Sequence, residues 1–273
     1  MVQGDRIEAL AGAIVGTLNN ILVGHIEGGE LSGTVDELMR HAITKLSHIH
    51  FVSNGQARNR LIQMGELDES IFVIDSPEID VMLSDRLPDL SEVRKAYEIP
   101  FSDYAIFMYH PVTMEVGTLK RNIESVLDAL EESGMNYIAI YPNNDNGTAV
   151  IMEALTRVRG NPRFRLIPSV RFESFLTLMK HARAMVANSS AGIREAPVFG
   201  IPTINIGSRQ RNRYNGSSIL NVPEEKAPIL NALNNLPVSV VPSLHFGKGE
   251  SAKSFIEELR NQKLWRTPLH KEF

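Results

Sequence analysis

The chain has 273 residues, of which 43% are hydrophobic and 22% are charged, a balance typical of a soluble globular protein. A formal net charge of −4 provides no overall positive field for nucleic acid, so no nucleic-acid partner is expected. The chain has no cysteine, no secretory signal and no apolar run near the roughly 20 residues that span a bilayer, so we expect a cytoplasmic protein with no membrane partner.

Short apolar runs typical of strands alternate with helical patterns along the whole chain, which predicts an α/β protein with parallel sheets. In residues 1–84 the pattern predicts three helices and three strands. The helices are expected at Ile7–Leu18, Val35–Leu46 and Gly55–Met64, and the strands at Ile21–Ile26, Ile49–Ser53 and Ile71–Ile74. Residues 1–84 are therefore predicted to form a partial N-terminal Rossmann-like domain.

The second half of the chain begins after a polar stretch, Ser84–Asp89, and has a more complete pattern. Its strands are expected at Ala105–Tyr109, Tyr137–Tyr141, Arg165–Ile167, Ala184–Ala187, Thr203–Ile206 and Ser218–Leu220. Helices fall between them, among them Leu119–Glu132 and Thr148–Val158, and Leu244–Gln262 supplies a C-terminal helix. Residues 85–273 are therefore predicted to form one full Rossmann-like domain.

The clearest functional pattern is the run Met185–Pro197, in which an apolar strand leads into small hydroxyl residues and then opens a helix. Backbone N–H groups and the hydroxyls of Ser189 and Ser190 could face one anion there, which suits a diphosphate. Glu195 follows at a position from which it could accept hydrogen bonds from a ribose diol. The alternative interpretation is an ordinary helix capped by Asn or Ser.

A second pattern is the run Gly24–Glu30, in which Glu27 follows the end of a predicted strand and is succeeded by two glycines that allow a ligand close to the backbone. Downstream, Asp36 and Arg40 lie four residues apart on one helix face, so the arginine could orient that carboxylate. With Asp5, three carboxylates could converge, and carboxylates in unlike environments supply an acid and a base at one pH. Each acid alone is more often a solvated loop residue or a cap, but their clustering at strand ends favours a functional site.

Three further polar residues follow strands of the second domain. His110 could donate a hydrogen bond to a phosphate or carry a proton near neutral pH, although a His before Pro is often only a turn residue. Asn143 lies in a turn-forming run at the sheet edge where a nucleotide would bind. Arg209, Arg211 and Arg213 are either a solvated face or guanidinium groups beside a diphosphate.

Other classes of site are disfavoured by what the sequence lacks. It contains no zinc-ligand spacing, no Gly-x-Ser-x-Gly, no Walker loop and no Gly-x-Gly-x-x-Gly. A dehydrogenase, an NTPase and a metal site are therefore not expected.

Six motifs follow one another along the chain: Gly4-Asp5-Arg6, His25–Glu30, Asp36 with Arg40–Leu46, His110-Pro111, Asn188–Glu195 and Gly207–Arg211. This ordered set resembles the hydrolysing UDP-N-acetylglucosamine 2-epimerases of sialic acid biosynthesis. The resemblance runs from about residue 2 to beyond Pro223, and the set is far more specific than any single motif.

The resemblance implies a glycosyltransferase-B-like architecture of two Rossmann-like domains with the sugar nucleotide in the cleft between them, no cofactor or metal, and a homodimer or homotetramer. Residues implied to bind UDP are Arg6, His110, Asn143, Ser189, Ser190, Glu195 and Arg209. Asp5, Glu27 and Asp36 match the acid/base carboxylates of the family, with Arg40 in support and His110 beside them in the catalytic set.

The implied reaction eliminates UDP with loss of the C2 proton to form a glycal, and water then adds to give N-acetylmannosamine. This requires a base at C2, stabilisation of the departing diphosphate and an acid/base pair for hydration. The alternatives are a nonhydrolysing 2-epimerase, a hydrolysing enzyme for a UDP-2,4-diacetamido sugar, and an inactive UDP-binding fragment.

One departure from the family concerns length. Members carry roughly another hundred residues, about a small domain, before the Gly-Asp-Arg motif. Met1 to Gln3 has the pattern of the end of a buried strand. We therefore expect an incomplete first sheet, an exposed apolar edge or face, and little or no activity from the chain alone; equal turnover by a version extended upstream would contradict this.

Overall fold

The computed structural model describes residues 1–32 and 35–271. The chain divides into two compact units, one formed by Met1–Ser84 with the chain from Leu244 onward, the other by Asp85–Ser243. The segment from Leu244 onward was predicted to lie in the second domain, whereas the structure groups it with the first unit.

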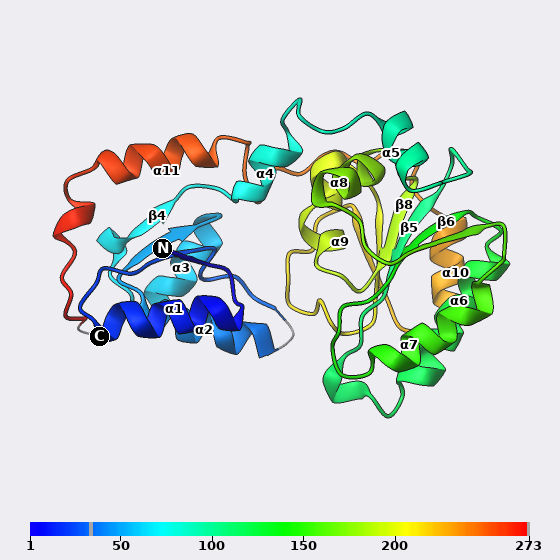
Figure 1. Ribbon diagram of the computed structural model, residues 1–273, viewed down its shortest axis with the longest axis horizontal. Coiled ribbons are helices and arrows are strands. Elements are labelled where there is room, and N and C mark those ends of the chain that lie inside the picture. Colours follow the sequence, from blue (N-terminus) through cyan, green and yellow to red (C-terminus); the bar gives the residue numbers. More distant parts are fainter. Residues whose placement is uncertain (33–34, 272–273) are drawn as a thin grey trace. The chain divides into compact units, whose positions relative to one another are not determined.

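The first unit contains a four-stranded parallel sheet in chain order (Figure 1). Its strands are β1 (Val2–Gln3), β2 (Gly24–Ile26), β3 (Ile49–Val52) and β4 (Ile71–Val73). Its first helices are α1 (Ile7–Leu18), α2 (Val35–Leu46), α3 (Gly55–Gln63) and α4 (Pro77–Met82). Strand β2 is shorter than predicted because the chain is still turning out of α1, with Asn20 at a φ of +55° and the Ile21 N–H bonded to the Gly16 carbonyl.

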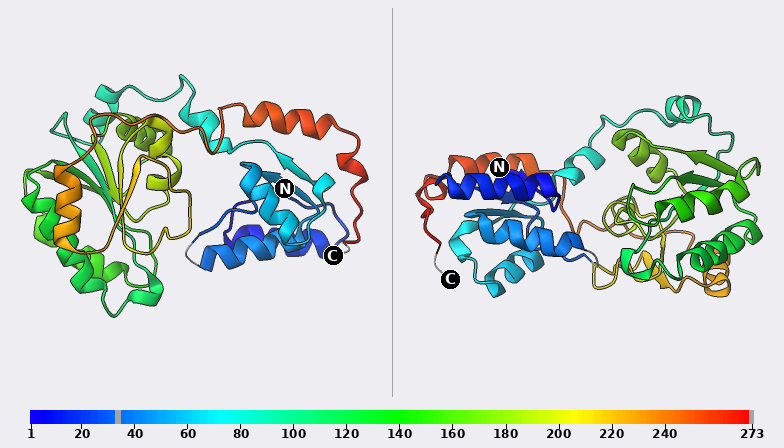
Figure 2. Two further views of the ribbon diagram at one scale, coloured as in Figure 1. Left: turned by 180° about the vertical axis from the view of Figure 1, so that it is seen from behind. Right: turned by 60° about the horizontal axis from the view of Figure 1, so that its bottom comes forward.

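Helices α1 and α2 lie side by side (Figure 2). The face of α1 toward α2 and the sheet is apolar, with Ala13 fully buried against Val23 and Ile43. The opposite face of α1 is also apolar but exposed, with Leu18 at 78% exposure and Ile7 at 68%. The exposed apolar face expected of this part of the chain is therefore present on α1.

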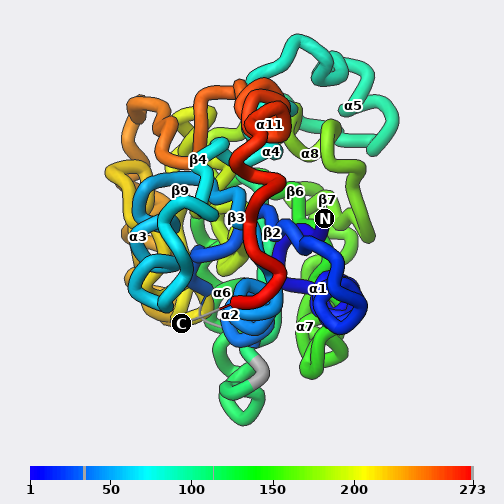
Figure 3. The backbone as a smooth tube through the Cα atoms, turned by 90° about the vertical axis from the view of Figure 1, so that its left-hand side faces the viewer, coloured from blue at the N-terminus to red at the C-terminus, as the bar shows by residue number. Residues whose placement is uncertain are grey.

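The C-terminal segment belongs to the first unit because it covers a hydrophobic face of the sheet. Side chains alternate along β3, and Ile49 and Phe51 pack on one face with Leu264. Phe255 and Leu259 of α11 (Ser251–Arg260) complete this cluster. Beyond α11 the chain passes β3 and reaches α2 (Figure 3), where the Lys271 ammonium donates to the Ser47 carbonyl at 2.5 Å.

The second unit contains a six-stranded parallel sheet in the order β10-β9-β8-β5-β6-β7. Its strands are β5 (Ala105–Met108), β6 (Tyr137–Ile140), β7 (Phe164–Ile167), β8 (Ala184–Ala187), β9 (Thr203–Ile206) and β10 (Ile219–Val222). Strands β6 and β7 follow β5 on one side of it, and β8, β9 and β10 follow on its other side, so the direction of the strand order reverses between β5 and β8. This is the strand order of a Rossmann fold, and ligands of such sheets bind beyond the carboxyl ends of the strands at the reversal.

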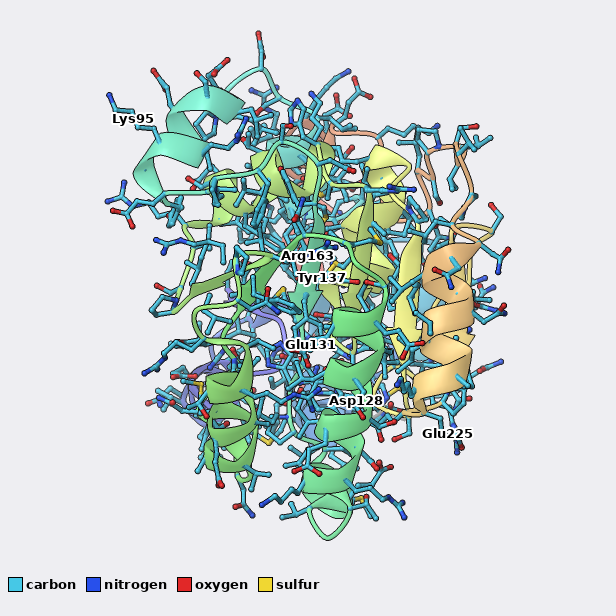
Figure 4. The ribbon with its side chains drawn as sticks, turned by 90° about the vertical axis from the view of Figure 1, so that its right-hand side faces the viewer. Lys95, Asp128, Glu131, Tyr137, Arg163 and Glu225 are labelled. Atoms are coloured by element: carbon cyan, nitrogen blue, oxygen red, sulfur yellow. The ribbon has the colours of Figure 1, made fainter. Side chains whose placement is uncertain are left out.

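Helices cover both faces of this sheet (Figure 1). On one face lie α6 (Leu119–Glu132), α7 (Thr148–Leu155) and α10 (Lys226–Asn234), and on the other α8 (Phe172–Lys180) and α9 (Ala191–Arg194). The periodicity of α6 explains its place, because it buries Ile123, Leu127 and Leu130 while Asp128 and Glu131 stay partly exposed and accept hydrogen bonds from Arg157 (Figure 4). The predicted α/β class and Rossmann-like sheet of this unit are confirmed.

Within residues 1–32 and 35–271, no helix combines the length and the apolar character that crossing a membrane requires.

Candidate functional site

The two strands at the reversal of strand order are joined by a side chain that follows one of them. The Asn188 amide, fully buried after β8, accepts from the His110 N–H at 2.7 Å and donates to the His110 carbonyl at 2.8 Å. His110 follows β5 and is 4% exposed. Because its amide is used on β5, Asn188 fixes the loop geometry at the switch point, a role beyond that of a helix cap.

The hydroxyl run after Asn188 opens a single helical turn, α9. Ser190 is the residue before this turn, and its side chain makes no capping hydrogen bond, while the Ser189 hydroxyl accepts from the Ala191 N–H at 3.3 Å. Glu195 ends the turn and is buried, at 9% exposure. In so short a helix, individual N–H groups and hydroxyls rather than a long macrodipole provide the positive potential for an anion.

The loop after β9 contributes a cation to the same place. Arg209 donates from Nη1 to the Asn188 carbonyl at 3.3 Å, and Gln210 donates from Nε2 to that carbonyl at 2.8 Å. The structure thus brings His110, Ser189, Ser190 and Arg209 to the ends of neighbouring strands. Gln210 was not predicted as a site residue, and its only signal in the sequence was its place beside Arg209 in the loop after a strand.

The protonation of His110 follows from its contacts. The Asn143 N–H donates to His110 Nδ1 at 3.3 Å, so the ring proton lies on Nε2. Burial, with a smaller effect of the Arg209 charge, lowers the pKa of His110 to about 4. His110 is therefore neutral at neutral pH, and its Nε2–H suits donation to a phosphate better than proton carriage near pH 7. Asn143 acts here through its backbone, since its side chain is exposed.

In the first unit, the loop after β1 holds an ion pair. Asp5 accepts from Arg40 of α2, whose side chain is 6% exposed, and Arg40 also donates to the Glu30 carbonyl at 3.1 Å. The sequence predicted Arg40 as the partner that orients Asp36 four residues earlier, but the structure pairs it with Asp5. Asp36 is half-buried in the first turn of the same helix, and Arg6 is exposed just before α1.

Glu27, directly after β2, has an unusual backbone. Its φ of +67° lies in the left-handed region that non-glycine residues avoid, and such strain is concentrated at functional sites. The side chain is 9% exposed and accepts from the Ser76 hydroxyl at 2.7 Å and from the Gln3 amide at 3.5 Å. Because Gln3 pairs with Ile26 in register, Asp5 and Glu27 follow neighbouring strands at the same edge of the sheet.

The two glycines after Glu27 are required by the packing of the protein itself. A Cβ on Gly28 would lie 2.9 Å from His25 Nδ1, and one on Gly29, whose φ is +77°, would lie 2.5 Å from the Ala57 carbonyl oxygen. The packing alone therefore explains why glycine stands at both positions, without the expected approach of a ligand.

His25 supports the Asp5 loop from β2. Its Nε2 donates to the Gly4 carbonyl at 2.8 Å and its Nδ1 accepts from the Thr44 hydroxyl at 3.1 Å. Complete burial is the main cause that lowers the pKa of His25 to about 4. The neutral ring thus holds the loop that presents Asp5.

The buried neutral His25 predicts that the first unit loses stability in mild acid. Below pH 6.5 the unfolded chain binds a proton at this position, whereas the folded chain binds it only below about pH 4. The contribution is therefore complete above pH 6.5 and is lost as the pH falls to about 4, with an upper limit of ~3 kcal/mol. Urea unfolding, followed by the fluorescence of Trp265 in this unit, measures the loss.

The matched comparison uses His25→Gln and His270→Gln. The His25→Gln variant is less stable near pH 7 but loses less stability on acidification, while replacement of the exposed His270 leaves the slope unchanged. An unchanged slope in His25→Gln contradicts this assignment.

Among the residues that the structure describes, no group of three or more His, Asp or Glu side chains is arranged to hold a metal ion.

Comparison with known proteins identifies relatives over the whole chain. A sequence profile described as UDP-N-acetylglucosamine 2-epimerase matches residues 1–260. A protein of that name from Neisseria meningitidis serogroup B is 47% identical, covering 100% of this chain and 74% of its own length. The UDP-N,N'-diacetylbacillosamine 2-epimerase (hydrolyzing) of Legionella pneumophila is 34% identical, covering 100% of this chain and 72% of its own.

A similar solved structure is the UDP-GlcNAc 2-epimerase of Methanocaldococcus jannaschii in complex with UDP-GlcNAc and UDP. It superimposes with a TM-score of 0.77 over 94% of this chain and 74% of that one, at 23% identity. At this identity the likeness establishes the glycosyltransferase-B-like fold, and this chain is shorter than its relatives.

Proposed function

Because the chain belongs to the UDP-N-acetylglucosamine 2-epimerase family, we propose that it is a hydrolysing member, which converts UDP-N-acetylglucosamine into N-acetylmannosamine and UDP. The observation that carries the proposal is the junction of β5 and β8, where His110, Asn188 and Arg209 meet beside the Ser189 and Ser190 hydroxyls. The name of the Legionella relative supports the hydrolysing outcome.

The second unit, in this proposal, binds UDP. Arg209, the His110 Nε2–H and the hydroxyls of Ser189 and Ser190 hold the diphosphate, and buried Glu195 accepts hydrogen bonds from the ribose. In a partly buried site, a cation and neutral hydrogen-bond donors together bind an anion more strongly than either kind of group alone. Arg6 and Asn143 are proposed to contact UDP as well.

The first unit, in this proposal, provides the proton chemistry. A carboxylate takes the C2 proton, the bond from C1 to the UDP oxygen breaks, and a double bond forms between C1 and C2. Water then adds its oxygen to C1 and gives one proton to a carboxylate, while a protonated carboxyl delivers a proton to the opposite face of C2. Asp5, Glu27 and Asp36 are the proposed acid/base groups, with Arg40 holding Asp5, and these steps are not divided among the three.

UDP binding tests the first part of this proposal. Arg209→Met is expected to weaken UDP binding about 10- to 100-fold, because hydrogen bonds to a charged group contribute roughly 1.5–3 kcal/mol. Isothermal titration of the chain with UDP measures it. Arg211→Met is the matched control, because Arg211 is exposed two residues further along the loop. Equal losses in both variants contradict a specific phosphate contact.

Product analysis in deuterium oxide tests the reaction. Free UDP with N-acetylmannosamine carrying deuterium at C2 supports the hydrolysing reaction, whereas UDP-N-acetylmannosamine identifies the nonhydrolysing one. The Legionella relative makes a UDP-2,4-diacetamido sugar the second candidate substrate, and relative kcat/KM values separate the two. UDP binding with no turnover, under conditions where an upstream-extended version turns over, identifies a UDP-binding fragment.

A further inference from the structure

Ser76, in the turn between β4 and α4, does not use its side chain as its place in the sequence suggests. A serine directly before a helix ordinarily accepts a hydrogen bond from an N–H of the first helical turn. Ser76 is the residue before α4, all of whose residues are described, and its side chain makes no such bond there. The hydroxyl instead donates to Glu27 Oε1 at 2.7 Å, and the residue is fully buried, at 0% exposure. Helix capping therefore does not account for this serine.

The backbone is strained on both sides of this hydrogen bond. Glu27 has a φ of +67°, and Asp75, the residue before Ser76, has a φ of +69°. Residues other than glycine rarely adopt this left-handed region, and they persist there only where the surrounding structure holds them. The two strained residues follow β2 and β4 of one parallel sheet, whose carboxyl ends share an edge. Both turns are thus held in the conformation that brings the hydroxyl to the carboxylate.

A distant segment of the chain holds the turn that carries Ser76. The Ser76 N–H donates to the Phe246 carbonyl at 2.8 Å, and the Lys248 N–H donates to Asp75 Oδ2 at 3.0 Å. Between these two contacts Gly247, whose φ is +145°, lies so close that a Cβ on it would be 2.6 Å from the Asp75 Cβ. The backbone of Ser76 is therefore fixed by contacts separate from the one that its hydroxyl makes.

The two oxygens of the Glu27 carboxylate are held unequally. Oε1 accepts the short hydrogen bond from the Ser76 hydroxyl, whereas Oε2 meets the Gln3 amide at 3.5 Å, the outer limit of a hydrogen bond. A donor fixed on one oxygen restrains the rotation of the whole carboxylate, and so it sets the direction in which the other oxygen points. An acid or base transfers a proton efficiently only from a defined direction and distance.

We propose that Ser76 is a positioning residue, whose hydroxyl holds the Glu27 carboxylate in the orientation from which it acts as acid or base. Ser76 acts through Glu27 and does not itself exchange a proton with the substrate. The role rests on the proposed function, because it requires Glu27 to take part in the reaction.

Turnover of UDP-N-acetylglucosamine by Ser76→Ala, in this chain and in a version extended upstream, tests the proposal. We expect kcat to fall about 10- to 100-fold, the effect of losing a hydrogen bond to a charged group and the alignment it provides. KM and UDP affinity are expected to stay unchanged, because the proposed diphosphate ligands lie in the second unit. Ser76→Thr keeps the hydroxyl and is expected to restore most of kcat.

The matched control is Ser53→Ala. Ser53 is 1% exposed and its hydroxyl also donates to a buried glutamate at 2.7 Å, but that glutamate is Glu30, which has no part in the proposed chemistry. Ser53→Ala is therefore expected to keep kcat. Equal losses of kcat in Ser53→Ala and Ser76→Ala overturn the proposal, since they indicate a general effect of removing a buried hydroxyl.

A double variant separates positioning from a structural role, and it decides if Ser76→Thr does not fold. Glu27→Gln with Ser76→Ala is expected to turn over at the rate of Glu27→Gln alone, because Ser76 acts through the carboxylate that is already lost. Losses that multiply, or an unchanged kcat in Ser76→Ala, overturn the role of Ser76 and leave the proposed function standing. Wild-type chains that bind UDP but turn over in neither version contradict the proposed reaction, and the positioning role with it.

Discussion

The Glu27→Gln variant is expected to turn over UDP-N-acetylglucosamine about 10³-fold more slowly than the wild type, within the range contributed by a positioned acid or base. Glutamine keeps the shape of the side chain and an oxygen that can accept from Ser76, so the fold around the strained backbone is retained. It cannot take a proton at neutral pH. A discontinuous assay of released UDP measures the turnover rate of the variant, both in this chain and in a version extended upstream. The wild-type form that turns over serves as the reference for its Glu27→Gln variant.

The control for Glu27→Gln is Glu30→Gln in the same loop. Both glutamates are buried and each accepts a 2.7 Å hydrogen bond from a serine hydroxyl, so they differ mainly in the proposed chemistry. Glu30→Gln is expected to keep turnover within about tenfold, and both variants are expected to bind UDP like the wild type. A Glu27→Gln enzyme with nearly full activity, or equal losses in the two variants, removes Glu27 from the acid/base set.

Local periodicity predicted the elements well where one face of a helix or strand decides its position. The bounds of α1, α2, α6, β8 and β9 agree with the prediction, since amphipathic spacing and buried apolar runs are local signals. The segment after Leu244 was assigned to the wrong unit for the opposite reason. Its helix was expected, but the contact of Phe255 and Leu259 with Ile49 and Phe51 joins positions about two hundred residues apart, which periodicity does not encode.

In the candidate site, too, local sequence patterns predicted some features, while contacts between distant parts of the chain were not predicted. Strand ends followed by polar residues predicted His110 and the Ser189-Ser190 run, because the carboxyl ends of parallel strands share one edge. The contact of Arg40 with Asp5 was not predicted, since the i, i+4 rule names only Asp36 and gives no sign of Asp5, which a different loop brings to the guanidinium. The positive φ of Glu27 likewise depends on the folded loop and has no signature in the sequence.

A buried ion-pair network fixes the C-terminal segment to the first unit. Glu66, 4% exposed, accepts from His50 Nε2 at 2.9 Å, from Lys45 Nζ at 3.1 Å and from Lys271 Nζ at 2.5 Å. Lys271 also donates to carbonyls at the end of α2, including that of Ser47. Burial raises the pKa of Glu66, but the hydrogen bonds from His50 and Lys271 outweigh it and lower the pKa to about 2.

The Glu66→Leu variant is expected to destabilise the first unit by about 3–5 kcal/mol, because removing one member of a buried network leaves the remaining charge unpaired. Urea unfolding followed by Trp265 fluorescence measures the loss. The folded pKa of Glu66 lies below its ordinary 4.5, so its contribution is complete above that pH and is lost as the pH falls toward 2. Glu66→Leu should therefore flatten the stability profile in this acidic window.

Glu69→Leu separates the network from a general effect of removing a carboxylate. Glu69 is exposed three residues further along, so its replacement is expected to change stability by less than about 0.5 kcal/mol. If the two variants lose similar stability, Glu66 does not anchor the tail. Lys271→Met is expected to be destabilised as Glu66→Leu is, while Glu69→Leu is not. A double variant of Glu66 and Lys271 that loses less stability than the sum of the two single variants shows that both residues act through one contact. Through that contact the C-terminal segment stabilises the unit that carries Asp5 and Glu27.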